Sequence, residues 1–326
     1  MAEIRVMRED LLPPKEPPRR HLISIRDLDR DDVERLLATA QSFEASLERE
    51  LKKLPTLRGK TVVNLFYEAS TRTRTSFEIA GKWLSADVIN FSASGSSTSK
   101  GESFIDTAKN IAAMSPDIVV VRHPSAGAAD LLARELPCSI VNAGDGAHEH
   151  PTQALLDLLT IREKKGHFDG LHVAIVGDIA HSRVARSDIH GMRKLGMTVT
   201  VAGPPTLIPP YVQELGAKVS YRLEDAIGDV DVIMMLRLQQ ERMTAGLIPS
   251  TREYARFWGL TLDKLARHAR PDVLIMHPGP VNRGIELSPE VADGPYSVIL
   301  DQVSRGVAVR MGVLLLLAGR KGGDDA

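Results

Sequence analysis

Short apolar runs alternate with longer amphipathic segments along most of this 326-residue chain. Several of the runs are apolar throughout, which is typical of strands covered by helices on both faces of a parallel sheet. The segments between them are mostly long enough for crossover helices, and the whole pattern occurs twice. The sequence therefore predicts an α/β protein of two domains, each a parallel sheet flanked by helices. The expected strands cover residues 61–67, 87–92, 117–122, 138–144, 172–178, 198–204, 217–221, 231–236 and 273–278.

The same pattern predicts the domain boundaries. Residues 1–20 are rich in prolines and charges ("LLPPKEPPRR") and are expected to form a flexible extension. The stretch "PTQALLDLLTIREKKGHFDG" separates the two sets of strands, so we expect one domain over residues 21–150 and another over 151–299. The last apolar helix has no strand after it. It is expected to pack back on the first domain, to which residues 300–326 are therefore assigned.

Composition excludes several classes of protein. A net charge of -1 argues against a nucleic-acid-binding protein, which normally carries a basic face. No apolar run approaches the roughly 20 residues that a membrane span needs, and the N-terminal segment lacks the apolar core of a signal peptide. The single cysteine, Cys138, excludes a disulfide framework. We therefore expect a soluble, cytoplasmic protein.

The stretch "FYEASTRTRTSFE", residues 66–78, places hydroxyl and guanidinium groups directly after the first strand and at the start of a helix. Ligands of parallel sheets bind outside the carboxyl ends of the strands, and the unpaired N–H groups of a helix's first turn attract anions. Ser70, Thr71 and Thr73 add hydroxyl donors. Arg72 adds a planar guanidinium group that can donate two parallel hydrogen bonds to phosphate oxygens. A capping motif with solvated arginines is the alternative, but this density of donors favours an anion site. Neither a Walker A loop nor a dinucleotide fingerprint occurs in the chain.

Polar side chains also follow the next strands. Arg122 and His123 end the third strand, and "NAGDGAHEHPTQ" brings His150 and Gln153 to the start of a helix. A histidine beside a glutamine at such a position suits the polarisation of a carbonyl and the orientation of an amide. No metal site is predicted, because His148 and His150 alternate on a loop with no third ligand nearby.

In the second half of the chain, arginines recur at strand ends. Arg183 follows one strand in "GDIAHSRVARS", and Arg237 and Gln239 follow another in "MMLRLQQERM". A single arginine is more often a surface charge, but two at corresponding strand ends are typical of carboxylate clamps. The turn "MHPGPVNRG" adds Gly279 and Pro280. The pattern indicates a phosphate-bearing substrate in one domain and a carboxylate-bearing substrate in the other.

Taken in this order, these motifs resemble the transcarbamylase family over nearly the whole chain, from "HLISIRDLDRDDVERLL" to the last helix. "STRTR" is highly specific to that family. "HPTQ" resembles its aspartate branch, whereas ornithine enzymes usually carry a cysteine at Thr152 and another in a Cys-Leu-Pro turn where this chain has "HPGP". The implied reaction transfers the carbamoyl group of carbamoyl phosphate to L-aspartate, giving N-carbamoyl-L-aspartate and phosphate in de novo pyrimidine (UMP) biosynthesis. The resemblance implies no cofactor and no metal.

The resemblance also implies a carbamoyl phosphate site. The catalytic side chains are expected at the phosphate and at the carbonyl oxygen: Arg72, Thr73, Arg122 and His150. The whole set expected to bind carbamoyl phosphate is Ser70, Thr71, Arg72, Thr73, Arg122, His150, Gln153, Ser96 and Lys100. Within it, Gln153 is expected at the carbamoyl nitrogen. Ser96 and Lys100 are expected to come from a neighbouring subunit.

A second set is implied for L-aspartate: Lys100, Arg183, Arg237, Gln239, Gly279 and Pro280. Arg183 and Arg237 are expected to clamp the two carboxylates, helped by Gln239. The backbone of Gly279 and Pro280 is expected to line the site. Many family members have a leucine at the position of Gly279, so here only backbone contributes. Closure of the two domains is expected, because arginines of both must surround the substrates.

The resemblance also implies partner chains. The family assembles as homotrimers with shared active sites, and the sequence leaves open whether regulatory chains or a dihydroorotase bind as well. Two alternative functions also stay open: a transcarbamylase for another amine such as ornithine, and a non-catalytic scaffold homologue in a pyrimidine-synthesis complex. Arg237 disfavours a basic amine. Loss of Arg72, Thr73, Arg122 or His150 would favour the scaffold, and all four are present.

Overall fold

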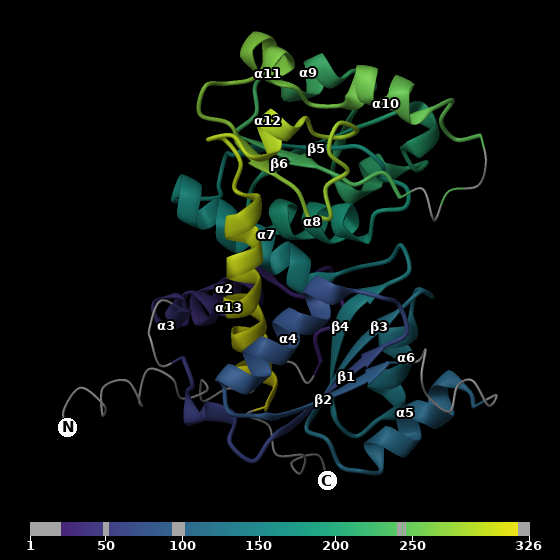
Figure 1. Cartoon of the computed structure of the whole chain (residues 1–326), viewed down its shortest axis with the longest axis vertical. Coiled ribbons are helices and arrows are strands. Elements are labelled where there is room, and N and C mark those ends of the chain that lie inside the picture. The colour runs from purple at the N-terminus through teal and green to yellow at the C-terminus, as the bar shows by residue number, and fades with distance from the viewer. Residues whose placement is uncertain (1–20, 48–51, 93–101, 240–242, 244–245, 319–326) are drawn as a thin grey trace. The chain divides into compact units, whose positions relative to one another are not determined.

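The computed structural model describes residues 21–47, 52–92, 102–239, 243 and 246–318 (Figure 1). The chain divides into two compact units, which we describe separately. Of the described residues, unit 1 takes those within 21–27, 31–146 and 306–318, and unit 2 takes those within 28–30 and 147–305. The predicted extension over residues 1–20 lies outside the described part of the chain.

Unit 1 is built on a parallel sheet with the strand order β2-β1-β3-β4. Its strands are β1 (Thr61–Phe66), β2 (Asp87–Ser92), β3 (Ile118–His123) and β4 (Ser139–Asp145). Every residue of β4 is buried, including its polar Ser139, Asn142 and Asp145, as is typical of a strand covered on both faces. On one face, Val63, Val119 and Ile140 pack with side chains of α5 and α6 into a single hydrophobic core. The helices of this unit are α2 (Arg30–Ser42), α3 (Glu44–Leu47), η1 (Pro55–Leu57), α4 (Thr71–Trp83), α5 (Phe104–Ala112) and α6 (Ala128–Glu135).

The C-terminal helix α13 (Ile299–Ala318) contributes its residues 306–318 to unit 1. Gly312 lets it approach α2 closely, because a Cβ there would lie 3.1 Å from the backbone nitrogen of Ala40. The Arg310 guanidinium stacks 5.1 Å from the centre of the Phe77 ring of α4. The predicted return of the last helix to the first domain is therefore present in the fold.

Unit 2 is built on a second parallel sheet, in the order β7-β6-β5-β8-β9. Its strands are β5 (His172–Val176), β6 (Thr198–Ala202), β7 (Lys218–Ser220), β8 (Val232–Met235) and β9 (Leu274–Met276). All the strands expected from the sequence form, with ends within two residues of the prediction. The helices of this unit are α7 (Pro151–Lys165), α8 (Arg183–Lys194), η4 (Pro205–Leu207), η5 (Val212–Leu215), α9 (Leu223–Ile227), α10 (Thr251–Trp258), α11 (Leu262–His268) and α12 (Pro289–Ala292).

Each sheet has a point where the strand order reverses, between β1 and β3 in unit 1 and between β5 and β8 in unit 2. Phe66 lies opposite Arg122 in the first pairing, and Val176 lies opposite Met235 in the second. The loops that follow such neighbouring strands diverge and leave room for a ligand at their carboxyl ends. The predicted site motifs begin at these positions.

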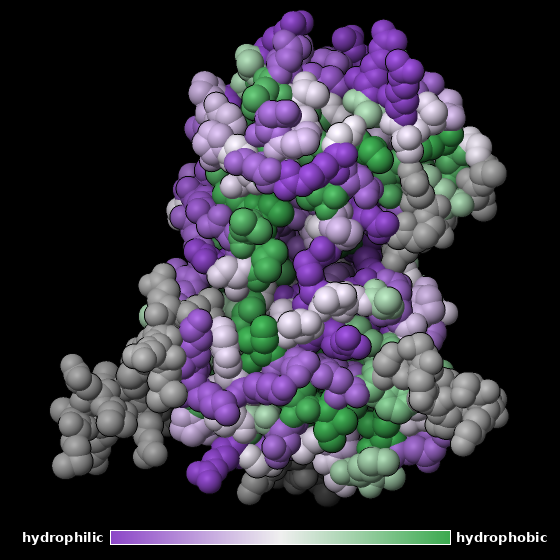
Figure 2. Space-filling view, viewed as in Figure 1, coloured by the Kyte–Doolittle hydropathy of each residue, from purple (hydrophilic) through white to green (hydrophobic). Residues whose placement is uncertain are grey.

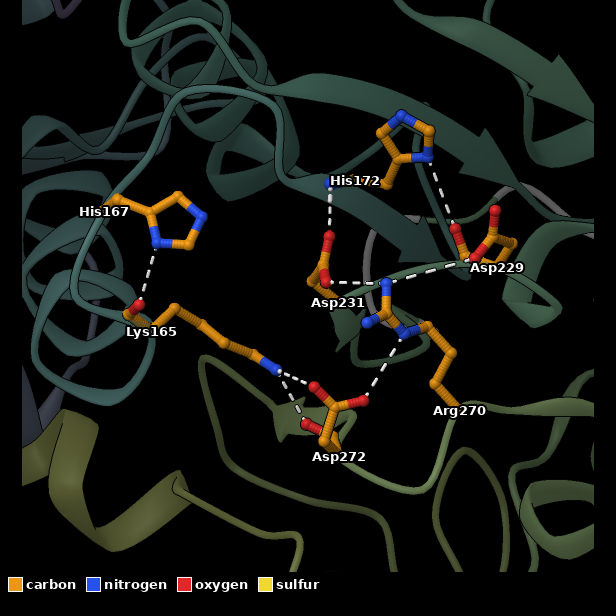
Figure 3. Close-up of polar contacts among 7 residues, drawn as sticks. All are labelled: Lys165, His167, His172, Asp229, Asp231, Arg270 and Asp272. Carbon is orange, nitrogen blue, oxygen red and sulfur yellow. Dashed lines mark hydrogen bonds and ion pairs between the residues drawn. The ribbon is translucent and has the colours of Figure 1, made fainter.

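A network of charges occupies the amino ends of the unit 2 strands (Figure 3). Asp231 accepts a hydrogen bond of 2.8 Å from the His172 backbone and pairs with Arg270 at 3.0 Å. Asp272 pairs with Arg270 at 3.3 Å and with Lys165 at 3.1 Å. Ligands of parallel sheets bind at the carboxyl ends of the strands, which is the opposite end of the sheet. We therefore assign this network the structural role of holding the amino ends of the strands together.

Hydrophobic side chains gather along α13 on the face drawn in Figure 2. Leu300 and Val303, near the start of this helix, are 82% and 51% exposed. Even so, none of the helices that the structure describes is both long enough and apolar enough to cross a membrane.

Candidate active site

The first candidate element is the N-terminus of α4. Ser70 is its N-cap residue in extended backbone geometry, and the Ser70 side chain makes no capping hydrogen bond. The first turn of α4 carries no acidic residue. Its N–H groups thus keep their partial positive charge, with Thr71 and Arg72 exposed and Thr73 buried around them. The arrangement suits an anion.

Arg122 lies near the end of β3 and pairs with Phe66, the last residue of β1, from which the chain leads into α4. The Tyr67 backbone N–H donates to the Arg122 carbonyl at 2.8 Å. The guanidinium donates to Glu68 at 2.7 Å and to the Ala143 carbonyl at 3.3 Å. Glu68, a partner that sequence reasoning did not single out, thus holds the guanidinium through one of its nitrogens and leaves its other N–H groups for further contacts.

His123, the neighbour of Arg122, has a structural role instead. Its ring lies 4.6 Å from the Phe104 ring and 5.3 Å from the Tyr67 ring. Its Nδ1 accepts a hydrogen bond of 3.0 Å from the Ser125 backbone. Burial lowers the pKa of His123, so the ring is neutral within this cluster.

In unit 2, His150 occupies the N-cap position of α7, with Pro151 after it, as predicted from the sequence. The His150 backbone N–H donates to Ser187 of α8 at 2.9 Å, and the Ser187 hydroxyl donates to Glu149 at 2.9 Å. Arg183 precedes Ser187 by four residues, so both lie on one face of α8. Helix α8 therefore presents Arg183 on the face that holds the His150 backbone.

Arg237 and Gln239 follow β8, and their loop is tied to the end of β5 by Asp178. This carboxylate is fully buried and accepts from the Gln239 backbone at 3.3 Å. It also accepts from the His181 backbone at 3.2 Å and contacts the His181 ring at 2.8 Å. Arg183 is buried at the start of α8, and Arg237 is half-buried. The two predicted clamp arginines therefore follow two neighbouring strands whose loops Asp178 joins.

Gly279 and Pro280 form the turn after β9. Gly279 has φ 63°, a left-handed conformation that favours glycine, and its N–H donates to Nδ1 of His277 at 2.8 Å. The His277 ring in turn lies 3.3 Å from the buried Glu286 carboxylate. The turn is thus held from behind by a buried pair, and Pro280 is exposed.

Two predicted residues, Ser96 and Lys100, lie outside the described residues. In the part of the chain that is described, no group of three or more His, Cys, Asp or Glu side chains could hold a metal ion.

Two family models match the chain. One, described as "Aspartate/ornithine carbamoyltransferase, carbamoyl-P binding domain", matches residues 20–163. The other, described as "Aspartate/ornithine carbamoyltransferase, Asp/Orn binding domain", matches residues 169–317. The chain belongs to the aspartate/ornithine carbamoyltransferase family. The resemblance seen in the sequence and the fold of two parallel-sheet domains are both confirmed.

Individual members of this family match almost the whole chain. The aspartate carbamoyltransferase catalytic subunit of Syntrophotalea carbinolica is 57% identical over 94% of this chain and 98% of its own length. A crystal structure of aspartate transcarbamoylase from Trypanosoma cruzi in complex with carbamoyl phosphate and aspartate has TM-score 0.83 and 30% identity, covering 91% of this chain and 96% of that one. Ornithine carbamoyltransferase from Pyrococcus furiosus has TM-score 0.82 and 30% identity, covering 92% and 97%. The backbone fold alone thus does not separate the two activities.

Sequence reasoning missed the acidic residues that hold these donors: Glu68, Glu149, Asp157, Asp178 and Glu286. Two of them carried a signal. Glu68 stands inside "FYEAST", next to the predicted donors, and Asp157 interrupts an otherwise apolar run, "ALLDLLTI". A charged residue in such a run needs a buried partner, and the structure shows one in Gln153.

Proposed function

We propose that this chain is the catalytic chain of an aspartate carbamoyltransferase, which transfers the carbamoyl group of carbamoyl phosphate to the amine of L-aspartate. One observation supports the proposal most: Arg122 pairs with Phe66, from which the chain leads into α4, whose first residues are Thr71, Arg72 and Thr73 and whose N-cap Ser70 makes no side-chain hydrogen bond. The relative from S. carbinolica, whose printed name gives this activity, supports it at 57% identity. The product, N-carbamoyl-L-aspartate, serves de novo pyrimidine synthesis.

The phosphate of carbamoyl phosphate binds at the N-terminus of α4. Ser70 and Thr71 offer hydroxyl groups, and the first-turn N–H groups add their partial positive charge. Arg72 is exposed and supplies a two-pronged donor for phosphate oxygens. This set holds the substrate's largest charge without a metal ion.

Arg122, Thr73 and His150 donate to the carbonyl oxygen, on which negative charge grows as the amine attacks. A pre-aimed donor of this kind contributes about 3 kcal/mol to lowering the barrier. Gln153 binds the carbamoyl nitrogen. The neutral amine of L-aspartate forms a bond to the carbonyl carbon, and the tetrahedral intermediate collapses as the bond to the phosphate oxygen breaks. The proton lost by the amine leaves with phosphate or passes to solvent.

L-aspartate binds through the second set of residues. Arg183 and Arg237 each pair with one of its carboxylates, and Gln239 adds a polar contact. The Gly279–Pro280 backbone lines the same site. Two clamps for two carboxylates suit a dicarboxylic amine and leave a basic amine such as ornithine without a counter-charge.

The active assembly is a homotrimer in which Ser96 and Lys100 of a neighbouring subunit complete the site, with Lys100 reaching both substrates. Regulatory chains or a dihydroorotase are further candidate partners. We place the enzyme in the cytoplasm, a reducing compartment, since the only cysteine of the chain, Cys138, is a buried free thiol.

A colorimetric assay for carbamoyl-aspartate tests the proposal. Purified protein is supplied with carbamoyl phosphate and either L-aspartate or L-ornithine. We expect product with L-aspartate, lost in Arg72→Ala and kept in Arg267→Ala, which removes an exposed arginine of α11. A folded protein that gives no product with either amine would instead indicate a scaffold, and citrulline formed from ornithine would indicate the ornithine branch.

A further inference from the structure

A buried polar network joins Gln153 to two other helices of unit 2. Gln153 Nε2 donates to the two carboxylate oxygens of Asp157 at 3.0 and 3.3 Å. Gln302, in the part of α13 that belongs to unit 2, donates to the same carboxylate at 2.6 Å. Asp188 of α8 forms a further side-chain hydrogen bond with Asp157. Asp157 and Asp188 are both fully buried.

The network fixes which way the Gln153 amide faces. An ionised carboxylate only accepts hydrogen bonds, so the amide must turn its NH₂ group toward Asp157. The carbonyl oxygen of Gln153 is then directed away from Asp157. Gln302 is fixed in the same manner, because its own oxygen accepts the His277 backbone N–H at 3.0 Å.

Asp188 supplies a further hydrogen bond to Asp157. Burial raises the pKa of Asp188 well above its usual range, and the negative charge of Asp157 raises it further. No donor within the described part of the chain reaches either oxygen of Asp188. A charge there would be uncompensated, so Asp188 carries a proton and donates it in a hydrogen bond to Asp157. The Asp157 carboxylate thus receives donors from Gln153, Gln302 and Asp188.

We propose that Asp157 is a positioning residue that turns the Gln153 oxygen toward the carbamoyl NH₂ group and so selects carbamoyl over other acyl phosphates. The inference rests on the proposed function, in which Gln153 binds the carbamoyl nitrogen. A carbamoyl group donates to this oxygen, whereas the methyl group of acetyl phosphate cannot. A site built to pair with an N–H rejects an analogue that lacks it, because the buried acceptor is left unpaired.

A purely structural role for the network would give different kinetics. If Asp157 only joined α7 to α13, its loss would lower the rate with every acyl phosphate alike. If Asp157 acts through Gln153, its loss lowers only the reaction of the substrate that carries the NH₂ group. Removing Asp157 from a protein that already lacks the Gln153 side chain should then change nothing further.

The experiment measures kcat and KM of the intact protein with carbamoyl phosphate and with acetyl phosphate, at saturating L-aspartate. The variants are Asp157→Ala, Gln153→Ala and the double variant. Asp157→Asn keeps one acceptor oxygen but adds a donor, so it should lose less than Asp157→Ala without reaching the wild-type values. Gln302→Ala breaks the same network but leaves the Gln153–Asp157 pair. It should keep the ratio of kcat/KM for carbamoyl phosphate to kcat/KM for acetyl phosphate within twofold of the wild-type ratio. Asp157→Leu, of similar volume, replaces the alanine variant if that fails to fold.

We expect Asp157→Ala to lower kcat/KM for carbamoyl phosphate about 10- to 100-fold, mainly through KM, with little change for acetyl phosphate. The double variant should match Gln153→Ala. Equal losses of kcat/KM for both acyl phosphates, or losses that add in the double variant, would overturn the inference. Carbamoyl-aspartate formed by the wild-type protein would in that case still support the proposed function. A wild-type protein that forms no carbamoyl-aspartate would overturn both.

Discussion

Phe66 lies directly opposite Arg122 in the register of β1 and β3. The chain leaves β1 one residue later and enters α4 at Thr71, so the start of α4 and Arg122 both follow from the carboxyl ends of these paired strands. That Arg122 and α4 belong to the same end of the sheet thus follows from strand pairing and not from sequence proximity.

Arg122→Ala should lower kcat with L-aspartate about 100- to 1,000-fold, since it removes a donor to the carbonyl oxygen. Steady-state rates at saturating substrates measure this. Arg134→Ala, which removes an exposed arginine of α6, is the matched control and should change kcat less than twofold. A kcat within tenfold of wild type for Arg122→Ala would show that Arg122 does not act on the reacting group.

Asp178→Ala should raise KM for L-aspartate more than KM for carbamoyl phosphate. The variant removes the acceptor that ties the Gln239 backbone to the end of β5, so the loop carrying Arg237 loses its anchor. Asp178→Asn keeps one acceptor oxygen and should be affected less. Equal changes in the two KM values would argue against a specific effect on the aspartate clamp.

Asp188→Asn should stabilise the folded protein increasingly as the pH rises. An aspartate of the unfolded chain has a pKa of about 3.9. In the folded protein, burial and the negative charge of Asp157 raise the pKa of Asp188. The stability contributed by protonated Asp188 is therefore complete below about pH 4 and declines as the pH rises toward the folded pKa. The asparagine amide has no such proton to lose and donates the same hydrogen bond to Asp157.

Urea unfolding of wild type and Asp188→Asn, at about pH 5 and about pH 8, measures this difference. Asp225→Asn, at an exposed position of α9, controls for the change in net charge. A difference in the free energy of unfolding that is the same at both pH values would mean that Asp188 is ionised in the fold.

Gly279→Leu should lower the free energy of unfolding of unit 2 by about 1–2 kcal/mol, because φ of 63° is strained for residues with a Cβ. Gly228→Ala is the control: Gly228 ends α9 in right-handed helical geometry, and its Cβ would meet only ordinary contacts. Calorimetric unfolding compares the two. A leucine variant as stable as wild type would show that this turn tolerates a side chain at position 279.

The strands could be predicted from the sequence because their apolar runs are continuous and bounded by turns. Ser70–Thr73, His150 and Arg183 could be proposed as site residues because they lie in segments that lead from a strand into a helix, and Arg122 because it lies near the end of β3. The acidic residues behind them could not. Whether Asp157 faces Gln153 or solvent depends on where α8 and α13 pack, and that packing has no signature in a local stretch of sequence. The salt bridge of Glu68 with Arg122 likewise depends on contacts 54 residues apart.

The amine selectivity of the purified protein shows whether its substrate is L-aspartate. Initial rates are measured with carbamoyl phosphate and either L-aspartate or L-ornithine, in wild type and in Arg237→Ala. We expect turnover of L-aspartate alone, with a KM for L-aspartate that rises at least tenfold when Arg237 is removed, about 1.4 kcal/mol of lost binding. Turnover of L-ornithine at a comparable rate, or an Arg237→Ala variant with unchanged KM, would contradict the assignment of the second unit to a dicarboxylic amine.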